Sequence, residues 1–389
     1  MAEFSKTIQI LLACVFTAML GLGIISPILP IYAKSLGATL AQVGLLSSAW
    51  SISRLVFSTP VGRLSDRSSK KRIIAAGLLL YAVVSLLYSI AWDFTSLITI
   101  RLFHGIGSAM AMPIAMAYAA ELTPPGQEGR YMGTMTFAIF GGMGLGPLIG
   151  GYLSDVFTLT APFYAMAGIT AVSLALTVFL LPDDGGRKAT DARPRGSFKD
   201  VLSKRLLRAA FVYRTIAALG RGSIMVFLSV YMGLPVADGG LGLSLSATGL
   251  VLSTAQFASA LLQRPFGVLA DRHNKITLTL MGGVLGAFGM ALLPFADSFW
   301  TVLAAQLAFT TGSALGMPAL TAIVAIEGRE IGMGTTMSVL QTSMSLGMIA
   351  GPLLSGILGD ALGLKPIFFI GSAIILVGTA SFYVLQRFG

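Results

Sequence analysis

Long runs of apolar residues alternate with short polar segments along the whole chain. An apolar run of about 20 residues crosses a hydrocarbon core about 30 Å thick when it forms a helix. By this criterion the sequence predicts twelve membrane-spanning helices, at residues 7–30, 42–61, 73–91, 96–120, 132–152, 162–181, 209–233, 245–265, 276–294, 299–323, 333–357 and 366–386. The predicted fold is therefore an all-α integral membrane protein with twelve transmembrane helices.

Three motifs in this pattern return after a constant offset of 205 residues. "VGRLSDRSSKKR" at 61–72 returns as "FGVLADRHNKIT" at 266–277, "GSAMAMP" at 107–113 as "GSALGMP" at 312–318, and "GPLIGGYLSD" at 146–155 as "GPLLSGILGD" at 351–360. We therefore expect two six-helix bundles in the same orientation, at 1–181 and 208–389. The segment 182–207 between them is predicted to be a cytoplasmic linker, because its first part is rich in Gly, Pro and charge.

Charge supports the membrane assignment and predicts the orientation. The chain is 55% hydrophobic and 11% charged, with a net charge of +10. If the N-terminus is cytoplasmic, 20 of the 26 Lys and Arg lie in or beside cytoplasmic segments, as the positive-inside rule requires. We therefore expect both termini on the cytoplasmic side of the inner membrane. The basic surplus then reflects topology and contact with membrane lipid, and nucleic acid is not an expected partner.

Four groups of residues stand out as motifs. They are Gly62, Leu64, Asp66, Arg67 and the basic residues 70–72; Arg101, Gly105 and Gly107; Gly142, Gly146, Pro147, Gly150 and Gly151; and "LGLGIISPILP" at 20–30. Together these motifs resemble those of the major facilitator superfamily, in particular its twelve-span drug and proton antiporter branch. The resemblance covers nearly the whole chain. It implies two parallel six-helix bundles that move a small-molecule substrate by alternating access.

Glycines and loop charges are the candidate gating residues. We expect Gly62 to let two helix ends approach closely, and Asp66 to accept hydrogen bonds at the start of a neighbouring helix, where the helix dipole favours an anion. The resemblance implies that this neighbour is the span at 333–357, with Arg67 and Glu121 completing a charge cluster. The alternative is a solvated loop that only fixes topology. The full gating set is Gly62, Asp66, Arg67, Gly267, Asp271, Arg272, Gly146, Pro147 and Gly151.

Four arginines lie within apolar runs, where a charged side chain is costly and usually faces a polar interior: Arg54, Arg101, Arg214 and Arg221. No Asp or Glu lies at comparable depth, so the sequence favours anionic or neutral amphipathic substrates. Arg214 is near a span end and has snorkelling as an alternative. The candidate substrate-binding residues are Arg54, Arg101, Arg221, Trp50, Phe57, Tyr118, Phe137, Phe227, Tyr231, Gln256 and Gln341. For each aromatic residue, ordinary packing is the alternative.

His104 is the candidate proton carrier. It lies one helical turn from Arg101, at a position where the resembling family commonly has Gln. An unperturbed histidine titrates near pH 6.5, within the working range of a cell. The candidate proton-coupling set is His104, Arg101 and Glu121. The alternative is that His104 is a structural, hydrogen-bonded substitute for Gln.

The sequence contains no phosphate-binding loop, metal-ligand cluster or nucleophile with an adjacent base. We therefore expect no enzymatic activity, metal or cofactor, and a proton gradient as the driving force. The leading hypothesis is a monomeric, proton-coupled exporter of amphipathic molecules, as in multidrug resistance. The alternatives are an uptake permease or exchanger for organic anions and, from another class, a membrane sensor or scaffold without transport activity.

Overall fold

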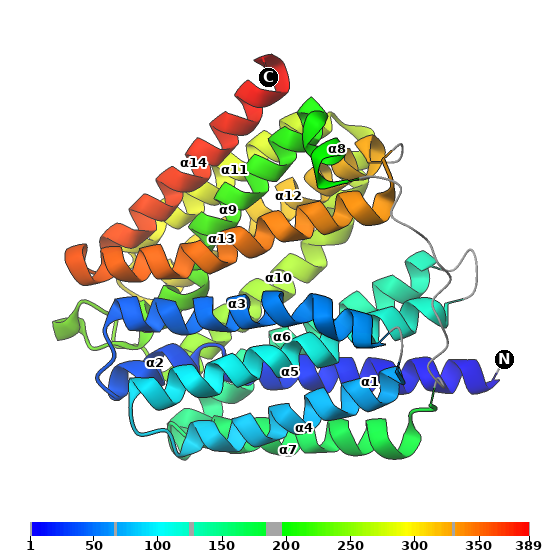
Figure 1. The fold of residues 1–389 in the computed structure, drawn as a ribbon. Helices are drawn as coiled ribbons and strands as arrows, with labels where there is room; N and C mark the ends of the chain where they lie inside the picture. The colour runs from blue at the N-terminus through cyan, green and yellow to red at the C-terminus, as the bar shows by residue number, and fades with distance from the viewer. Residues whose placement is uncertain (1, 66–67, 124–127, 184–196, 329–330, 389) are drawn as a thin grey trace. The chain divides into compact units, whose positions relative to one another are not determined.

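The computed structural model describes residues 2–65, 68–123, 128–183, 197–328 and 331–388. Over these ranges the chain is helical and contains no strand (Figure 1). The helices are α1 (Ala2–Ile25), α2 (Ile28–Ser35), α3 (Leu40–Ser65), α4 (Lys70–Ser89), α5 (Phe94–Glu121), α6 (Glu128–Val156), α7 (Ala161–Leu180), α8 (Phe198–Ser203), α9 (Arg205–Gly233), α10 (Leu245–Arg272), α11 (Lys275–Leu292), α12 (Phe299–Glu327), α13 (Met333–Leu362) and α14 (Leu364–Phe388). Two short 3-10 helices, Val236–Asp238 and Leu293–Phe295, lie between them.

Twelve membrane-spanning segments are found within the described residues, which confirms the predicted number. The first span is longer than predicted, because it runs from Lys6 to Ser35 through both α1 and α2. It is interrupted at Pro27, the N-cap of α2. Proline has no N–H to donate to the preceding turn, so the helix breaks and restarts there.

Prolines recur inside helices at repeat-related positions. Pro60 and Pro265 lie in α3 and α10, Pro113 and Pro318 in α5 and α12, and Pro147 and Pro352 in α6 and α13. A proline inside a membrane helix is tolerated where neighbouring groups satisfy the freed carbonyl. Their recurrence shows that the two halves of the sequence build corresponding helices in the same way.

The helices sort into two compact units. Unit 1 contains residues 1–38, 49–190 and 244–253, and unit 2 contains residues 39–48, 191–243 and 254–389. In unit 1, α1 packs on α6 and α7, and α4 packs on α5 and α7. In unit 2, α9 packs on α13 and α14, and α11 packs on α12 and α14. Each unit therefore includes the first turns of one helix, α10 or α3, whose remainder belongs to the other unit.

The glycines of α6 bring that helix against α1. A Cβ at Gly142 would collide with the Phe16 carbonyl oxygen, and one at Gly146 with the backbone of Gly23 and Ile24. The repeat-related glycines of α13 do the same against α9, where Gly347 meets Thr215 and Gly351 meets Leu219. Both helix pairs thus pack closely, and the role of Gly146, Pro147 and Gly151 in gating stays a prediction.

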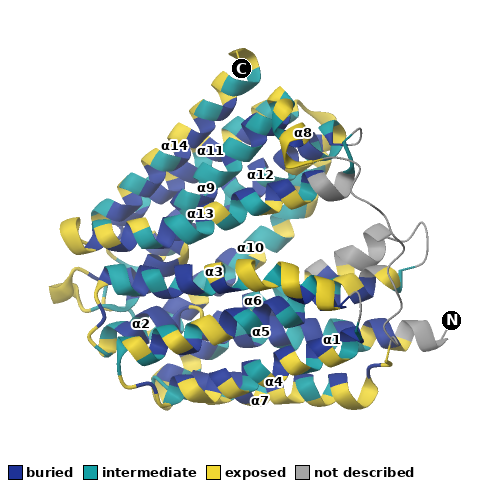
Figure 2. Ribbon diagram, viewed as in Figure 1, coloured by how far each residue is buried: buried dark blue, intermediate teal, exposed yellow. Residues whose placement is uncertain are grey.

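Apolar side chains also cover the outer faces of the helices. Figure 2 shows exposed positions along α4 and α7. On α4, Leu79, Val83, Leu86 and Leu87 are all exposed and share one face at helical spacing. Such a continuous apolar face is unsuited to water and matches the hydrocarbon of a bilayer.

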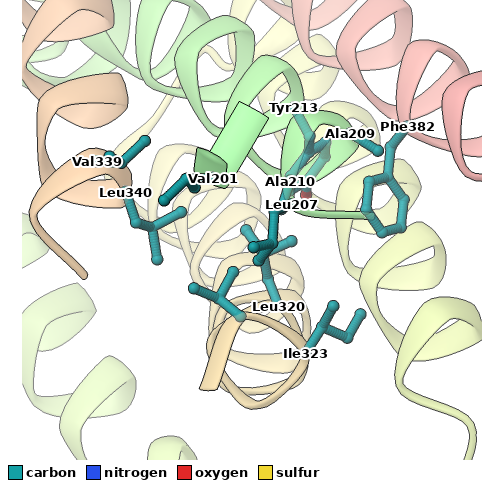
Figure 3. Close-up of a cluster of buried hydrophobic side chains, with 11 residues drawn as sticks. Val201, Leu207, Ala209, Ala210, Tyr213, Leu320, Ile323, Val339, Leu340 and Phe382 are labelled. Carbon is teal, nitrogen blue, oxygen red and sulfur yellow. The ribbon is translucent and has the colours of Figure 1, made fainter. Parts of the chain in front are cut away.

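A buried apolar cluster anchors the short helix α8 in unit 2 (Figure 3). Val201 of α8 is 2% exposed and lies with Val339 and Leu340 of α13 and with Leu207 of α9. Ser197 begins α8 with a capping box, because its side chain accepts from the Asp200 N–H while the Asp200 carboxylate accepts from the Ser197 N–H. The end of the predicted linker is therefore part of the unit 2 core.

Candidate substrate and proton site

Two arginines of unit 1 flank one indole ring. The Arg54 guanidinium carbon lies 5.3 Å from the centre of the Trp50 ring, and that of Arg101 lies 5.5 Å from it. Trp50 and Arg54 are one turn apart on α3, and Arg101 comes from α5. Cations within about 6 Å of an aromatic face are attracted by its quadrupole. The structure thus brings together three of the residues predicted to bind substrate.

Close packing of α3 on α5 places this group. A Cβ at Gly105 would collide with the Trp50 carbonyl oxygen and with Ser53, and the Ser53 hydroxyl donates to the Leu102 carbonyl at 2.7 Å. Gly105 allows the two helices to approach closely because it carries no side chain. Arg101, one turn earlier on α5, is therefore held beside Trp50.

His104 is fully buried next to the same arginine. Its Nδ1 lies 3.1 Å from the Tyr88 hydroxyl and 3.3 Å from Arg101 Nη1, and the Tyr81 ring packs edge-on against the imidazole at 4.6 Å. A guanidinium only donates hydrogen bonds, so we assign Nδ1 as an acceptor. In the neutral ring the proton then resides on Nε2.

Three buried N–H groups of this cluster have no acceptor among the described residues. They are Trp50 Nε1, Arg101 Nε and His104 Nε2. A buried donor without a protein partner carries a desolvation cost, so these groups are candidates to bind water or a ligand. Three donors next to two guanidinium groups suit the oxygen atoms of an anion or of water.

Unit 2 holds a second pair of arginines, both on α9. The Arg221 guanidinium carbon lies 5.9 Å from the Phe309 ring centre, and Arg214 Nη2 lies 3.4 Å from the sulfur of Met344. Gln306, one turn from Phe309 on α12, has a buried side-chain oxygen without a partner among the described residues. Unit 2 therefore also contains a cation, an aromatic ring and a polar acceptor within its helices.

Carboxylates occur only at the ends of the described spans. Glu121, the last residue of α5, pairs with Lys70, whose ammonium is 3.1 Å away and whose side chain is 1% exposed. Glu121 was predicted to join Arg67 in a charge cluster; its ion pair here is with Lys70, and Arg67 and Asp66 lie outside the described residues. The Asp155 and Asp360 carboxylates accept backbone N–H bonds near helix ends.

The other predicted gating residues are placed as follows. In the described part of the chain nothing lies within 4 Å of a Cβ built at Gly62 or at Gly267. The close approach expected at Gly62 stays a prediction, because its predicted neighbour, the span at 333–357, belongs to the other unit. Asp271 and Arg272 are exposed at the end of α10. A Cβ at Gly151 would collide with the Leu245 carbonyl oxygen.

The remaining substrate candidates differ in how far they are buried. Phe227 and Tyr231 are fully buried in unit 2, and the Tyr231 hydroxyl donates to the Ala296 carbonyl at 3.0 Å. Phe137 is 76% exposed, and Phe57 is 39% exposed. Gln256 is half-buried and Gln341 is exposed.

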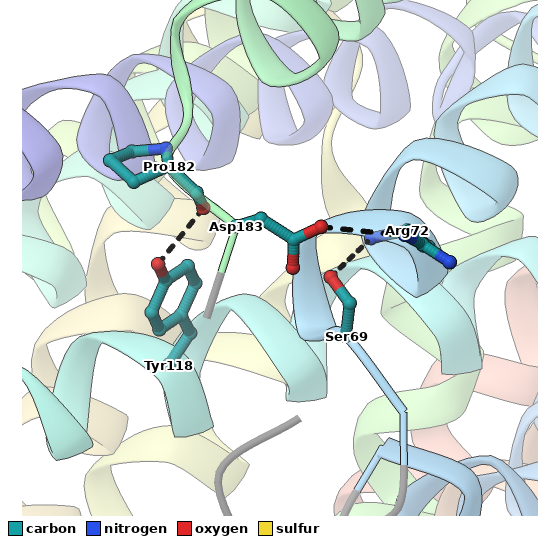
Figure 4. A network of polar contacts seen from close by, with 5 residues as sticks. All are labelled: Ser69, Arg72, Tyr118, Pro182 and Asp183. Carbon is teal, nitrogen blue, oxygen red and sulfur yellow. Dashed lines mark hydrogen bonds and ion pairs between the residues drawn. The ribbon is translucent and has the colours of Figure 1, made fainter. Parts of the chain in front are cut away.

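Tyr118, another substrate candidate, makes a hydrogen bond to the start of the predicted linker. Its hydroxyl donates to the Pro182 carbonyl at 3.1 Å, and the next residue, Asp183, lies 3.7 Å from Arg72 in an ion pair (Figure 4). The Ser69 hydroxyl accepts from the Arg72 N–H and caps α4. These contacts tie the start of the linker to the ends of α4 and α5.

A cavity of about 300 Å³ in unit 2 contains none of the predicted site residues. It is lined by Lys204, Arg205, Leu206, Ile276, Glu327 and Gln386, at the ends of four long helices. Lys204 also donates to the Glu327 carbonyl at 3.1 Å.

Two side chains of α4 were missed by sequence reasoning. Tyr81 and Tyr88 both contact His104, and they lie seven residues apart on one helix face. This spacing was the available signal, because two tyrosines on one face of an apolar helix point to a polar partner for their hydroxyl groups.

The twelve apolar spans form two sets of corresponding helices, and some spans contain an arginine in their interior. This architecture is that of a membrane transporter of the parallel-repeat class. The family model described as Major Facilitator Superfamily matches residues 11–335 and 211–388. The chain belongs to this superfamily.

Known relatives agree. An uncharacterised MFS-type transporter of Methanocaldococcus jannaschii is 30% identical over all of both chains. The quinolone resistance protein NorA of Staphylococcus aureus is 28% identical over 92% of this chain and 90% of its own. The crystal structure of a bacterial homologue of the human lysosomal transporter Spinster has a TM-score of 0.82 at 16% identity, and covers 99% of this chain and 97% of its own, which shows the same fold.

Proposed function

We propose that this chain is a secondary active transporter that exports small anionic or neutral amphipathic molecules in exchange for protons, by alternating access of its two halves. The observation that carries the proposal is the pair Arg54 and Arg101 on the Trp50 ring, in described spans that hold carboxylates only at their ends. A cation beside an aromatic face suits an anionic head on an aromatic body. The name of NorA as a resistance protein supports export.

His104 is the proposed proton carrier. Nδ1 carries the only ring lone pair that can accept a proton in the neutral imidazole, and Arg101 Nη1 donates a hydrogen bond to that atom. A proton on Nδ1 and a hydrogen bond from Arg101 exclude one another. Protonation therefore releases Arg101, which links the charge of His104 to the position of a substrate-binding residue.

The same contact favours the alternative function, uptake of an organic anion together with a proton. When the proton displaces Arg101, the guanidinium becomes available to an anion, so the two ligands promote each other's binding. Exchange requires the opposite, since an antiporter must bind its two ligands at different times. Neutral substrates do not meet this conflict, because they gain nothing from the released charge.

Transport into proteoliposomes distinguishes these functions. The purified protein is reconstituted, and uptake of an aromatic carboxylate and of its neutral methyl ester is followed under gradients of either direction. Accumulation in vesicles with an acidic lumen supports proton exchange, and accumulation from an acidic exterior supports uptake with a proton. A chain that accumulates neither probe under either gradient, across a panel of such pairs, contradicts both functions and leaves the sensor or scaffold.

We also propose a monomer in the inner membrane with both termini cytoplasmic, in contact with lipid and independent of cofactors. The support for the orientation is the positive-inside distribution of Lys and Arg. A reporter fused to either terminus is expected to report the cytoplasm.

A further inference from the structure

Two carboxylates hold the beginnings of two helices that are distant in sequence. In unit 1, the Asp155 carboxylate accepts the backbone N–H groups of Leu245 at 3.1 Å and Ser246 at 2.7 Å. In unit 2, the Asp360 carboxylate accepts those of Leu40 at 2.7 Å and Ala41 at 2.9 Å. Each carboxylate thus binds the first two N–H groups of α10 or of α3.

The two arrangements are related by the internal repeat. Asp360 follows Asp155 by the same 205 residues by which Leu245 follows Leu40. Asp155 comes from the first half of the sequence and binds a helix of the second half, whereas Asp360 does the reverse. Such an exchange goes beyond what each half needs for its own folding.

Glycines bring the backbones close enough for this contact. A Cβ at Gly151 would collide with the Leu245 carbonyl oxygen, and one at Gly356 with the Leu40 carbonyl oxygen. Further along the same helices, Ser253 Oγ accepts from the Leu148 N–H at 3.0 Å. In unit 2, Ser48 Oγ donates to the Ile349 carbonyl at 2.6 Å. The helices α6 and α10 are therefore in direct contact, and so are α13 and α3. Each carboxylate lies at one end of such a contact.

Helix physics explains why a carboxylate suits this place. The first N–H groups of a helix have no partner within the helix, and the helix dipole places partial positive charge there. Each helix also has a cap of its own, because Thr39 Oγ1 accepts from the Gln42 N–H and Ser244 Oγ from the Ala247 N–H. The aspartates accept the first two N–H groups of each helix, which these local caps do not bind.

We propose that Asp155 and Asp360 are paired helix-capping latches, which must release whenever the transporter opens on the side opposite its N-terminus. Asp155 ends the fifth span and Asp360 the eleventh, so both lie on that side of the membrane. Opening on this side draws the start of α10 from Asp155 and the start of α3 from Asp360. The caps thereby set how readily that opening occurs.

Two buried positions report release. Thr248 of α10 and Val43 of α3 are 0% and 1% exposed, and they occupy the same place in the repeat. Thr248→Cys or Val43→Cys is made in a Cys14→Ser background, which removes the single native thiol. The protein is placed in lipid nanodiscs, and the rate of alkylation by a charged maleimide is measured.

Loss of one latch is expected to speed alkylation. Asp155→Asn removes the charge and one of the two acceptors, so we expect the rate at Thr248→Cys to rise about three- to tenfold, the range for a hydrogen bond to a charged group at a helix end. Because opening exposes both reporters, the rate at Val43→Cys is expected to rise as well. If the alkylation rate rises only at Thr248→Cys, the variant has loosened the start of α10 locally, and the latch proposal is wrong.

Asp93→Asn is the matched control. Asp93 also binds a helix-terminal N–H, that of Ser96 at 2.8 Å, but it caps its own helix α5. That N–H lowers the pKa of the Asp93 carboxyl, which is therefore charged at neutral pH. We expect Asp93→Asn to leave both rates unchanged. An equal rise in Asp93→Asn overturns the proposal.

A second variant removes the donor and keeps the carboxylate. Leu245→Pro deletes one N–H that Asp155 accepts, at the first position of a helix, where proline is well tolerated. It is expected to speed alkylation of Thr248→Cys, and an unchanged rate in both Leu245→Pro and Asp155→Asn contradicts the latch. The measurement needs neither substrate nor gradient, so it stands or falls separately from the proposed function.

Discussion

At the scale of single residues, the Arg54, Trp50 and Arg101 group combines attraction and repulsion. Each guanidinium is attracted to the indole, while the two cations repel each other across it. The described residues of unit 1 place no carboxylate between them. An anionic ligand relieves this repulsion, so the group is better suited to a bound state than to an empty one.

Arg54→Gln tests this group. We expect the dissociation constant of an aromatic carboxylate to rise about tenfold, the range for one hydrogen bond to a charged group, and that of its methyl ester to change less than about twofold. Arg221→Gln is expected to act in the same direction in unit 2. Binding is measured by fluorescence titration. Equal weakening of the acid and the ester indicates disturbed packing and contradicts anion recognition.

His104 provides the second test at this scale. His104→Gln keeps a hydrogen-bonding side chain but does not titrate, so we expect substrate exchange to persist and accumulation driven by a pH gradient to be lost. Tyr88→Phe removes one of the two donors to Nδ1 and is expected to shift the pH profile of transport while leaving substrate binding intact. Full gradient-driven accumulation by His104→Gln eliminates this proton carrier.

The Lys70 and Glu121 pair concerns stability. Glu121→Gln removes the negative charge that Glu121 places beside the buried Lys70 ammonium, which is expected to cost about 1–3 kcal/mol, less than for a fully buried pair because Glu121 is 38% exposed. Asp183→Asn breaks the exposed pair with Arg72 and is expected to cost at most about 1 kcal/mol. Thermal unfolding in detergent compares the two, and equal losses contradict the role of burial.

The sequence predicted which residues carry charge but not which partners they have. Arg54, Arg101 and His104 were identifiable because a charged or titratable residue stands out in an apolar run. The partners of Tyr81, Tyr88 and Lys70 became visible only with helix packing, because an apolar helix surrounded by helices and lipid carries little pattern that says which face meets which neighbour.

At the scale of helices, glycine decides which elements touch. Gly146 lies against the backbone of α1, whereas a Cβ at Gly168 of α7 would meet nothing within 4 Å among the described residues. Both glycines lie inside membrane helices.

Gly146→Ala and Gly168→Ala therefore form a matched pair. We expect Gly146→Ala to lower stability by about 1–3 kcal/mol through overpacking. Gly168→Ala is expected to raise it slightly, by up to about 1 kcal/mol, because alanine restricts the unfolded chain. Melting temperatures in detergent give the comparison. If Gly146→Ala leaves the melting temperature unchanged, α1 and α6 can move apart with little loss of stability, which contradicts the expected overpacking.

The number of helices and their repeat were predictable, since apolar length and motif spacing are local properties of the chain. Their ends were less so: the first span continues to Ser35, because α2 restarts beyond Pro27. The contacts of Gly151 and Gly356 with the starts of α10 and α3 were not predicted, because the sequence gives no direct sign of which helix a glycine face receives.

At the scale of the whole molecule, the proposed latches act against the gate predicted at Asp66. Asp66 follows α3 in the sequence, at the end of a span on the same side as the N-terminus, and lies outside the described residues. If it stabilises closure of that side, its loss and the loss of Asp155 shift the transport cycle in opposite directions.

Asp66→Asn is therefore expected to slow alkylation of Thr248→Cys by about two- to fivefold, whereas Asp155→Asn speeds it; a shift of this size corresponds to less than about 1 kcal/mol. We also expect Asp66→Asn to reduce turnover more than substrate affinity. Alkylation and transport are measured on the same preparation. A change in the same direction for both variants contradicts opposed gates.

The exchange of helix caps has the symmetry of a contact between two identical subunits. Position 155 meets position 245 and position 360 meets position 40, which is the reciprocity found where two identical subunits share an isologous interface. Each half of the sequence therefore carries both partners of this contact, the aspartate and the helix start. A single polypeptide thus contains the kind of reciprocal contact that otherwise joins two separate chains.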